Sequence, residues 1–159
     1  MKLYLCRHGQ AVAQAATDAL RPLTQAGQAA VLAHWQALEE EGVVINRVVA
    51  SPFLRAQQTA ECITRVYQGL TIENCEALVP DSPPSAVFDW LLAQDLPAGT
   101  VLVSHMPLVS VLTAAWTGAG RERFPFNVGT VACLDVEVMA ADGARLLWLA
   151  SPGESLRHR

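Results

Sequence analysis

The chain has 159 residues, of which 52% are hydrophobic and only 16% are charged. This length suits one domain with a single sizeable core, which we expect to span residues 1–159, and the low charge content excludes a disordered chain. The net charge is −4 and the 11 lysines and arginines form no dense run, so nucleic acid is excluded as a partner.

Strand-like apolar runs alternate with helix-like segments along most of the chain. We expect strands at residues 2–6, 45–50, 70–74 and 100–104, and helices at residues 24–41, 53–67, 84–94 and 107–117. Thr24 is the expected N-cap of the first helix and Ser51 that of the second. Residues 130–151 instead predict two strands joined by a turn at Asp142 and Gly143. Together these elements predict an α/β fold of three layers, α/β/α, whose mostly parallel sheet has an antiparallel edge.

The apolar segments and the cysteines indicate where the protein works. The most apolar segment, residues 100–116, is interrupted by Ser104, His105 and Pro107, so it predicts a strand, a turn and a helix rather than a membrane span. The N-terminal apolar run is too short for a signal peptide. The four cysteines lack C-x-x-C spacing and are expected to be reduced thiols: Cys6, Cys62, Cys75 and Cys133. We therefore expect a cytoplasmic protein that does not contact a membrane.

Three of the predicted strand-to-helix junctions carry basic side chains. Arg7 and His8 follow the first strand, Arg55 follows the second and His105 follows the fourth. We call these four residues the basic cluster. We expect them to lie close together, because the carboxyl ends of parallel strands share one edge of a sheet, where ligands bind. Two arginines offer bidentate hydrogen bonds to phosphate oxygens, and helix N-termini at the same edge favour an anion. The predicted ligand is a phosphoryl group.

The two histidines of the basic cluster suggest how a phosphoryl group would react. A neutral imidazole among arginines resists protonation, and its free nitrogen can attack phosphorus to form a covalent phosphohistidine. His8 is the preferred nucleophile because Gly9 allows close backbone approach, and His105 would stabilise the developing charge. A metal site is disfavoured, because the arginines repel a divalent cation and no carboxylate cluster shares these junctions.

Cys6 is the competing nucleophile, since it stands next to the basic pair. Its position and apolar neighbours are those of a core strand residue. A cysteine mechanism would also need a phosphate-binding loop with an arginine six positions later, and that position is Val12. We therefore expect Cys6 to be structural.

The same junctions carry a resemblance to a known family. "RHG" after the first strand, "SPFLRAQQTA" after the second and "SHMP" after the fourth resemble the histidine phosphatase superfamily, which has the phosphoglycerate-mutase-like fold. "RPLTQAG", "VSHMPLV" and the closing "WLASP" are most similar to the small SixA-type protein phosphohistidine phosphatases, over nearly the whole chain. The resemblance implies that His8 is the phosphorylated nucleophile and that Arg7, Arg55 and His105 complete the phosphate pocket. It also implies a phosphohistidine substrate on a signalling or phosphotransfer protein, hydrolysed without metal or organic cofactor.

The chain departs from the superfamily at the general acid. Many members place a glutamate after the third strand, whereas residues 74–84 offer only Glu76 and Asp81, of which Asp81 is slightly preferred. An imidazole leaving group can be protonated on its own ring and needs less help than an alkoxide, so a weak acid signal favours phosphohistidine. Arg21 either lines the pocket rim or pairs with Asp18, and we favour the pairing.

Two other functions remain compatible with these residues. The same site can hydrolyse a small-molecule phosphate ester, in which case a clear acid at Glu76 or Asp81 is expected. A non-catalytic module that binds phosphoproteins would keep the anion pocket without turnover, and the intact basic cluster makes it the least favoured function. The oligomeric state stays open, because an apolar composition fits a deep core or a dimer face.

Overall fold

The computed structural model of the chain describes residues 1–119, 124–154 and 156. Its strands are β1 (Lys2–Arg7), β2 (Arg47–Ala50), β3 (Ile72–Asn74), β4 (Thr100–Ser104), β5 (Val131–Val136) and β6 (Ala144–Ala150). Its α-helices are α1 (Gln25–Glu40), α2 (Leu54–Val66), α3 (Pro84–Leu92) and α4 (Leu108–Thr117). Two single-turn 3-10 helices, η1 (Asp18–Leu20) and η2 (Glu76–Leu78), lie in the connections.

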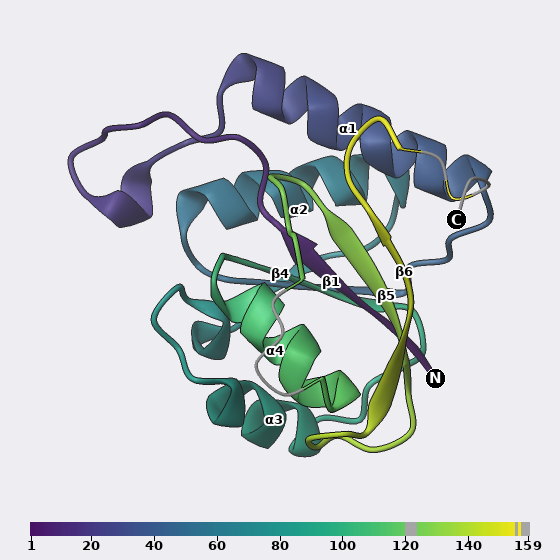
Figure 1. Cartoon of the computed structure of the whole chain (residues 1–159). Helices are drawn as coiled ribbons and strands as arrows, with labels where there is room; N and C mark the ends of the chain where they lie inside the picture. Colours follow the sequence, from purple (N-terminus) through teal and green to yellow (C-terminus); the bar gives the residue numbers. More distant parts are fainter. Residues whose placement is uncertain (120–123, 155, 157–159) are drawn as a thin grey trace.

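The strands of the described residues form one six-stranded sheet in the order β3-β2-β4-β1-β5-β6. β3, β2, β4 and β1 pair in parallel, whereas β5 pairs antiparallel with both β1 and β6. Helices α1 and α2 cover one face of this sheet, and α3 and α4 cover the other (Figure 1). The predicted three-layer α/β fold with an antiparallel edge is therefore confirmed.

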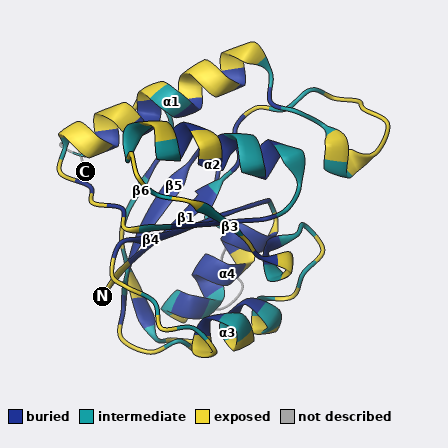
Figure 2. Cartoon of the chain, turned by 180° about the vertical axis from the view of Figure 1, so that it is seen from behind, coloured by how far each residue is buried: buried dark blue, intermediate teal, exposed yellow. Residues whose placement is uncertain are grey.

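Alternation along the strands builds a separate core on each face of the sheet. Successive strand side chains point to opposite faces. Leu3 and Leu5 of β1 join the core under α3 and α4, while Tyr4 and Cys6 join the core under α1 and α2. The central strands of the sheet are almost entirely buried, whereas the edge strands β3 and β6 are partly exposed. Most exposed residues lie on the outer faces of the helices and on the loops (Figure 2). The central strands are thus fixed from both sides, which makes their carboxyl ends a rigid base for a site.

The structure corrects the predicted start of the second helix. Ser51 is not the N-cap of α2, because the helix begins at Leu54 with Phe53 as its N-cap. The Ser51 hydroxyl instead accepts a hydrogen bond from the Phe53 N–H at 3.2 Å, one turn before the helix. Thr24, in contrast, is the N-cap of α1, as predicted.

The remaining helices and strands lie where they were predicted, and they differ from the prediction only at their ends. β5 and β6 are joined by residues 137–143, in which Asp142 has a left-handed φ of 59°. All four cysteines are buried, unbridged thiols. Among the helices of the described residues, none is long and apolar enough to span a membrane.

Candidate active site

The ends of β1, β2 and β4 bring the basic cluster together. These strands are neighbours in the sheet, and all three run in the same direction. Just past the strands, the His8 N–H donates to the Ser104 carbonyl and the Ser51 N–H donates to the Val103 carbonyl, each at 3.0 Å. The ring centroids of His8 and His105 lie 5.1 Å apart. The Arg55 Nε lies 3.4 Å from the His8 Nε2. Residues far apart in the chain therefore meet at one sheet edge, as predicted.

His8 is held in the form that a nucleophile requires. Its Nδ1 lies 2.7 Å from the Gly9 carbonyl oxygen, which can only accept, so Nδ1 carries the ring proton and Nε2 keeps its lone pair. Burial, together with the charges of three neighbouring arginines, lowers the pKa of His8 to about 4, although the hydrogen bond to Gly9 opposes this shift. The ring is therefore neutral near pH 7, and its unprotonated Nε2 accepts a long hydrogen bond of 3.4 Å from the Arg55 Nε–H.

Two glycines let helix α1 pack against the loop that follows His8. A Cβ on Gly9 would lie 2.6 Å from a methyl group of Val31. A Cβ on Gly27 would collide with the Gln10 carbonyl. The Gln10 carbonyl also accepts from the Thr24 N–H at 2.9 Å. The "RPLTQAG" segment thus holds the loop after His8 against the start of α1.

Thr59 ties the same loop to helix α2. Its hydroxyl accepts from the Gly9 N–H at 3.0 Å and donates to the Arg55 carbonyl at 2.8 Å. Thr59 is fully buried in α2, one turn after Arg55. The spacing between Arg55 and Thr59 in "SPFLRAQQTA" therefore fixes His8 and Arg55 relative to each other.

Asp18 is the acidic partner of two arginines at the site. Arg55, only 5% exposed, donates from Nη1 to the Asp18 carbonyl at 2.7 Å and from Nη2 to its carboxylate at 3.2 Å. Arg21 donates to the same carboxylate at 2.8 Å, which confirms the predicted Asp18–Arg21 pair. Hydrogen bonds from Arg21 and then Arg55 lower the pKa of Asp18, so this carboxylate stays ionised. Its contact with Arg55 was not predicted, because Asp18 lies in an irregular segment without a periodic signal.

Two buried nitrogens at the site have no partner among the described residues. The Arg7 Nη1 donates to the Phe126 carbonyl at 2.8 Å, but its Nε makes no hydrogen bond. His105 is 1% exposed; its Nε2 lies 2.8 Å from the Ser51 hydroxyl, and its Nδ1 makes no hydrogen bond. Burial lowers the pKa of His105 to about 3, with further contributions from His8 and Arg55. Unpaired buried polar groups are costly, and two of them at one site point to a partner that the described residues do not supply.

Phe53 forms an aromatic wall beside these groups. Its ring lies 5.1 Å from the Arg55 guanidinium and 5.2 Å, edge on, from the His105 ring. This role of Phe53 was not predicted, because a single aromatic residue before a helix is ordinarily a packing residue. A flat, partly exposed ring between a cation and an imidazole can pack against a planar group of a substrate.

The structure does not bring the two candidate acids into the basic cluster. The turn η2 is joined to β4 by a 2.6 Å hydrogen bond from the Ser104 hydroxyl to the Leu78 carbonyl. Glu76 and Asp81, at either end of that region, are both exposed. In the described part of the chain, neither makes a hydrogen bond or an ion pair with the basic cluster. A general acid role for either residue stays a prediction.

Cys6 is unsuited to the competing cysteine mechanism. The thiol is fully buried in the core under α1 and α2, and burial raises its pKa to about 12. Only the thiolate is a good nucleophile, and such a pKa leaves almost none near neutral pH. Cys6 is structural, as expected.

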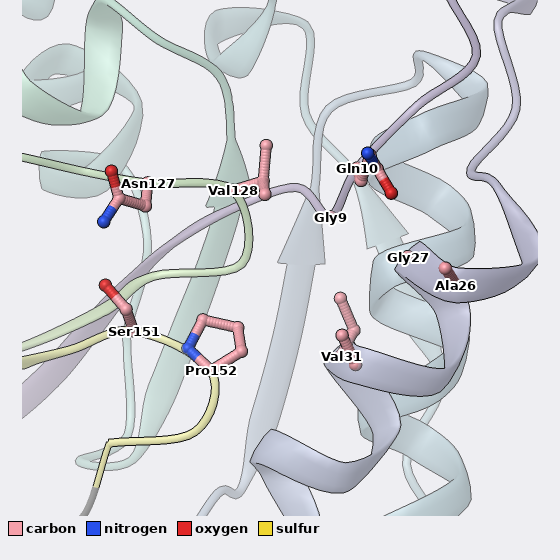
Figure 3. Close-up of a pocket in the computed structure, with 10 residues that line it drawn as sticks. Gly9, Gln10, Ala26, Gly27, Val31, Asn127, Val128, Ser151 and Pro152 are labelled. Carbon is pink, nitrogen blue, oxygen red and sulfur yellow. The ribbon is translucent and has the colours of Figure 1, made fainter.

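A cavity of about 340 Å³ adjoins the site on the side of α1 (Figure 3). The backbone of Gly9 and Gln10 forms one wall, while Asn127, Val128 and Pro152 line the other. It contains none of the basic cluster and no charged residue, so its chemistry does not suit a phosphoryl group. Within the described residues, no group of three His, Cys, Asp or Glu side chains is placed to hold a metal ion.

Known proteins resemble this chain in sequence and in fold. The family model for the histidine phosphatase superfamily (branch 1) matches residues 3–79. The phosphohistidine phosphatase SixA of Escherichia coli K12 is 34% identical over 122 residues, covering 72% of this chain and 73% of that protein. A SixA homologue of Haemophilus influenzae is 30% identical over 170 residues, covering 100% of this chain and 95% of the relative. This chain belongs to the histidine phosphatase superfamily.

Structural comparison places the chain within a subgroup of that superfamily. The structure of the protein histidine phosphatase SixA complexed with tungstate superposes with a TM-score of 0.81 at 30% identity. The match covers 96% of this chain and 97% of that one. The resemblance to SixA-type members and the phosphoglycerate-mutase-like fold are thereby confirmed, and the enzyme class is that of a phosphatase, a hydrolase.

Proposed function

We propose that this histidine phosphatase hydrolyses phosphohistidine on a signalling or phosphotransfer protein through a covalent phospho-His8 intermediate. The observation that carries the proposal is the unprotonated His8 Nε2, which lies 3.4 Å from Arg55 beside the unpartnered Arg7 Nε and His105 Nδ1. A neutral nucleophile next to free cationic and N–H donors suits attack on an anionic phosphoryl group.

The reaction proceeds in two displacements. In the first, the His8 Nε2 attacks phosphorus and a new P–N bond forms as the P–N bond of the substrate breaks. The substrate imidazole leaves neutral when its other nitrogen already holds a proton. In the second, water attacks phosphorus and the bond to His8 breaks. Inorganic phosphate takes up the oxygen and the protons of the water, and His8 returns to its neutral Nδ1–H form. Arg7, Arg55 and His105 stabilise the phosphoryl charge in both steps.

The surroundings of the site favour an imidazole leaving group over an alkoxide. Among the described carboxylates, Asp18 is the one that contacts the basic cluster, and its pKa is lowered by two arginines, so it is a poor proton donor. Glu76 and Asp81 are exposed, and within the described residues neither makes a hydrogen bond or an ion pair with the cluster. An alkoxide needs a positioned acid, whereas a protonated imidazole does not. SixA-type relatives that are described as phosphohistidine phosphatases support the same substrate class.

Phosphate release from a phosphohistidine-bearing phosphotransfer domain, measured beside a panel of small phosphate esters, tests the proposal. We expect a strong preference for the phosphoprotein and a loss of roughly a thousandfold or more in His8→Ala, because the nucleophile is removed. Rapid acid-free quenching with radiolabelled substrate should trap label on the wild-type protein and none on the variant. His34→Gln, which changes a buried histidine outside the basic cluster, serves as the matched control.

Other outcomes assign other functions. Turnover by a folded His8→Ala protein would eliminate the covalent route. Preference for an ester would keep the site and move the activity to small-molecule dephosphorylation. Stoichiometric binding of the phosphoprotein without phosphate release would indicate a binding module.

A further inference from the structure

Ser51 is the hydrogen-bond partner of the His105 ring. Ser51 is fully buried, and its backbone N–H donates to Val103, two residues before His105. Its hydroxyl contacts two nitrogens, the Phe53 N–H at 3.2 Å and the His105 Nε2 at 2.8 Å. The Phe53 N–H can only donate, so the Ser51 oxygen accepts there and its own proton remains to be placed.

Counting the hydrogen-bonding groups distinguishes the two tautomers of His105. If Nε2 carried the proton, the Ser51 oxygen would accept twice and its buried hydroxyl proton would have no acceptor among the described residues. The His105 Nδ1 would then be a second unsatisfied group. If the Ser51 hydroxyl donates to Nε2, Nδ1 carries the proton and is the one group left unsatisfied. Fewer unpaired buried groups means a more stable site, so the Nδ1–H tautomer is favoured.

This tautomer matters because of what approaches His105. The His105 ring lies 5.1 Å from the His8 ring, and the free Nε of Arg7 belongs to the same site. A phosphoryl oxygen would be attracted to an Nδ1–H donor and repelled by an Nδ1 lone pair. We propose that Ser51 is a positioning residue that holds His105 in the Nδ1–H tautomer, so that this proton is donated to the phosphoryl group on His8. The assignment rests on the proposed function only for the identity of the phosphoryl group.

Two-bond proton–nitrogen correlation spectra of uniformly ¹⁵N-labelled protein test the assignment directly. The chain has four histidines, so the ring signals can be assigned by single substitutions. Near pH 7 the ligand-free wild type should show a protonated Nδ1 and an unprotonated Nε2 at His105. Addition of inorganic phosphate should shift the Nδ1–H signal without changing the tautomer.

Three variants separate this role from a purely structural one. Ser51→Ala should give mixed tautomers at His105 and lower kcat by about tenfold with little change in KM, since the donor is misplaced only part of the time. Ser51→Thr keeps the hydroxyl and should restore both the spectrum and kcat. Thr113→Val removes an equally buried hydroxyl in α4 that donates to the Val109 carbonyl, and it should change neither.

The outcomes that overturn the assignment are distinct from those that overturn the function. A protonated Nε2 in the wild type would refute it, as would an unchanged tautomer in Ser51→Ala despite reduced activity. If Ser51→Ala does not fold, the wild-type and Ser51→Thr spectra still decide. If the tautomer responds as expected while the wild type releases no phosphate from the phosphoprotein, Ser51 keeps its role and the proposed substrate is wrong.

Discussion

Asp18 offsets part of the positive charge that the site presents to an anion. The carboxylate pairs with Arg55 and Arg21, and Arg7 lies in the same site without a carboxylate partner among the described residues. A phosphate ion entering the site therefore meets three arginines and one opposing carboxylate. The expected consequence is faster release of inorganic phosphate after each turnover, because its affinity is held down.

Replacing Asp18 with asparagine should tighten the binding of inorganic phosphate. Removal of one negative charge a few ångströms from the ligand predicts roughly a fivefold lower Kd at low ionic strength, and less at high salt. Calorimetric titration of phosphate into wild type and Asp18→Asn at two salt concentrations measures this. Asp135→Asn, which removes a partner of the N-terminus and Arg145 away from the site, is the control. Weaker phosphate binding in Asp18→Asn would mean that Asp18 acts mainly by orienting Arg55.

The first turn of helix α1 helps to set the position of His8. Gly27 faces the Gln10 carbonyl, two residues after His8, at a distance that leaves no room for a methyl group. The loop after His8 is also held by Thr24 and Thr59. The position of His8, the proposed nucleophile, therefore depends on how closely this helix approaches the loop.

Gly27→Ala should lower kcat by about tenfold to a hundredfold, because the added methyl group pushes the loop that carries His8 away from Arg55. Alanine has the higher helix propensity by about 1 kcal/mol, so any loss must come from the contact and not from the helix itself. Steady-state kinetics with chemical denaturation measures both effects. Gln28→Ala, at the next and exposed position of α1, should leave kcat unchanged. Full activity in Gly27→Ala would show that the loop position tolerates this shift.

The elements were predictable where local chemistry decides the structure. Thr24 caps α1 through its own side chain, and alternating residues such as Tyr4 and Leu5 mark β1 as a strand with two buried faces. The basic cluster was predictable because its members follow strand ends that a parallel sheet brings together. The contact of Asp18 with Arg55 spans 37 residues and the contact of Arg7 with Phe126 spans 119. Such through-space contacts follow from the packed fold and leave no local pattern in the sequence.

At the scale of the whole molecule, the two buried histidines of the site lower the free energy of unfolding in acid. Burial lowers the pKa of His8 to about 4 and of His105 to about 3, from an ordinary value of 6.5. Below pH 6.5 the unfolded chain takes up protons that the folded chain does not, so acidification favours unfolding. The loss of folding stability begins near the pKa of a histidine in the unfolded chain and levels off only below the pKa values of the two histidines in the folded chain.

The free energy of unfolding should therefore fall between pH 6.5 and 4, by on the order of 2 kcal/mol for each buried histidine. Urea denaturation at pH 7 and pH 4.5 measures the fall, and His8→Gln should reduce it. Carboxylates with a lowered pKa, such as Asp18, lose their contribution to folding stability at more acidic pH, below about 4. The fall between pH 6.5 and 4 therefore comes mainly from the histidines. An equal fall in wild type and His8→Gln would exclude His8 as its source.

The sheet order also determines when during synthesis the site can exist. β1, which carries Arg7 and leads into His8, pairs with β4 and β5. Both partners come late in the chain, after residue 99. A nascent chain that has reached the end of α2 already contains Arg7, His8 and Arg55 but has no strand beside β1. The proposed nucleophile, His8, is therefore synthesised well before the strands that hold it in place. A polypeptide interrupted before β4 should be inert toward phosphoryl groups.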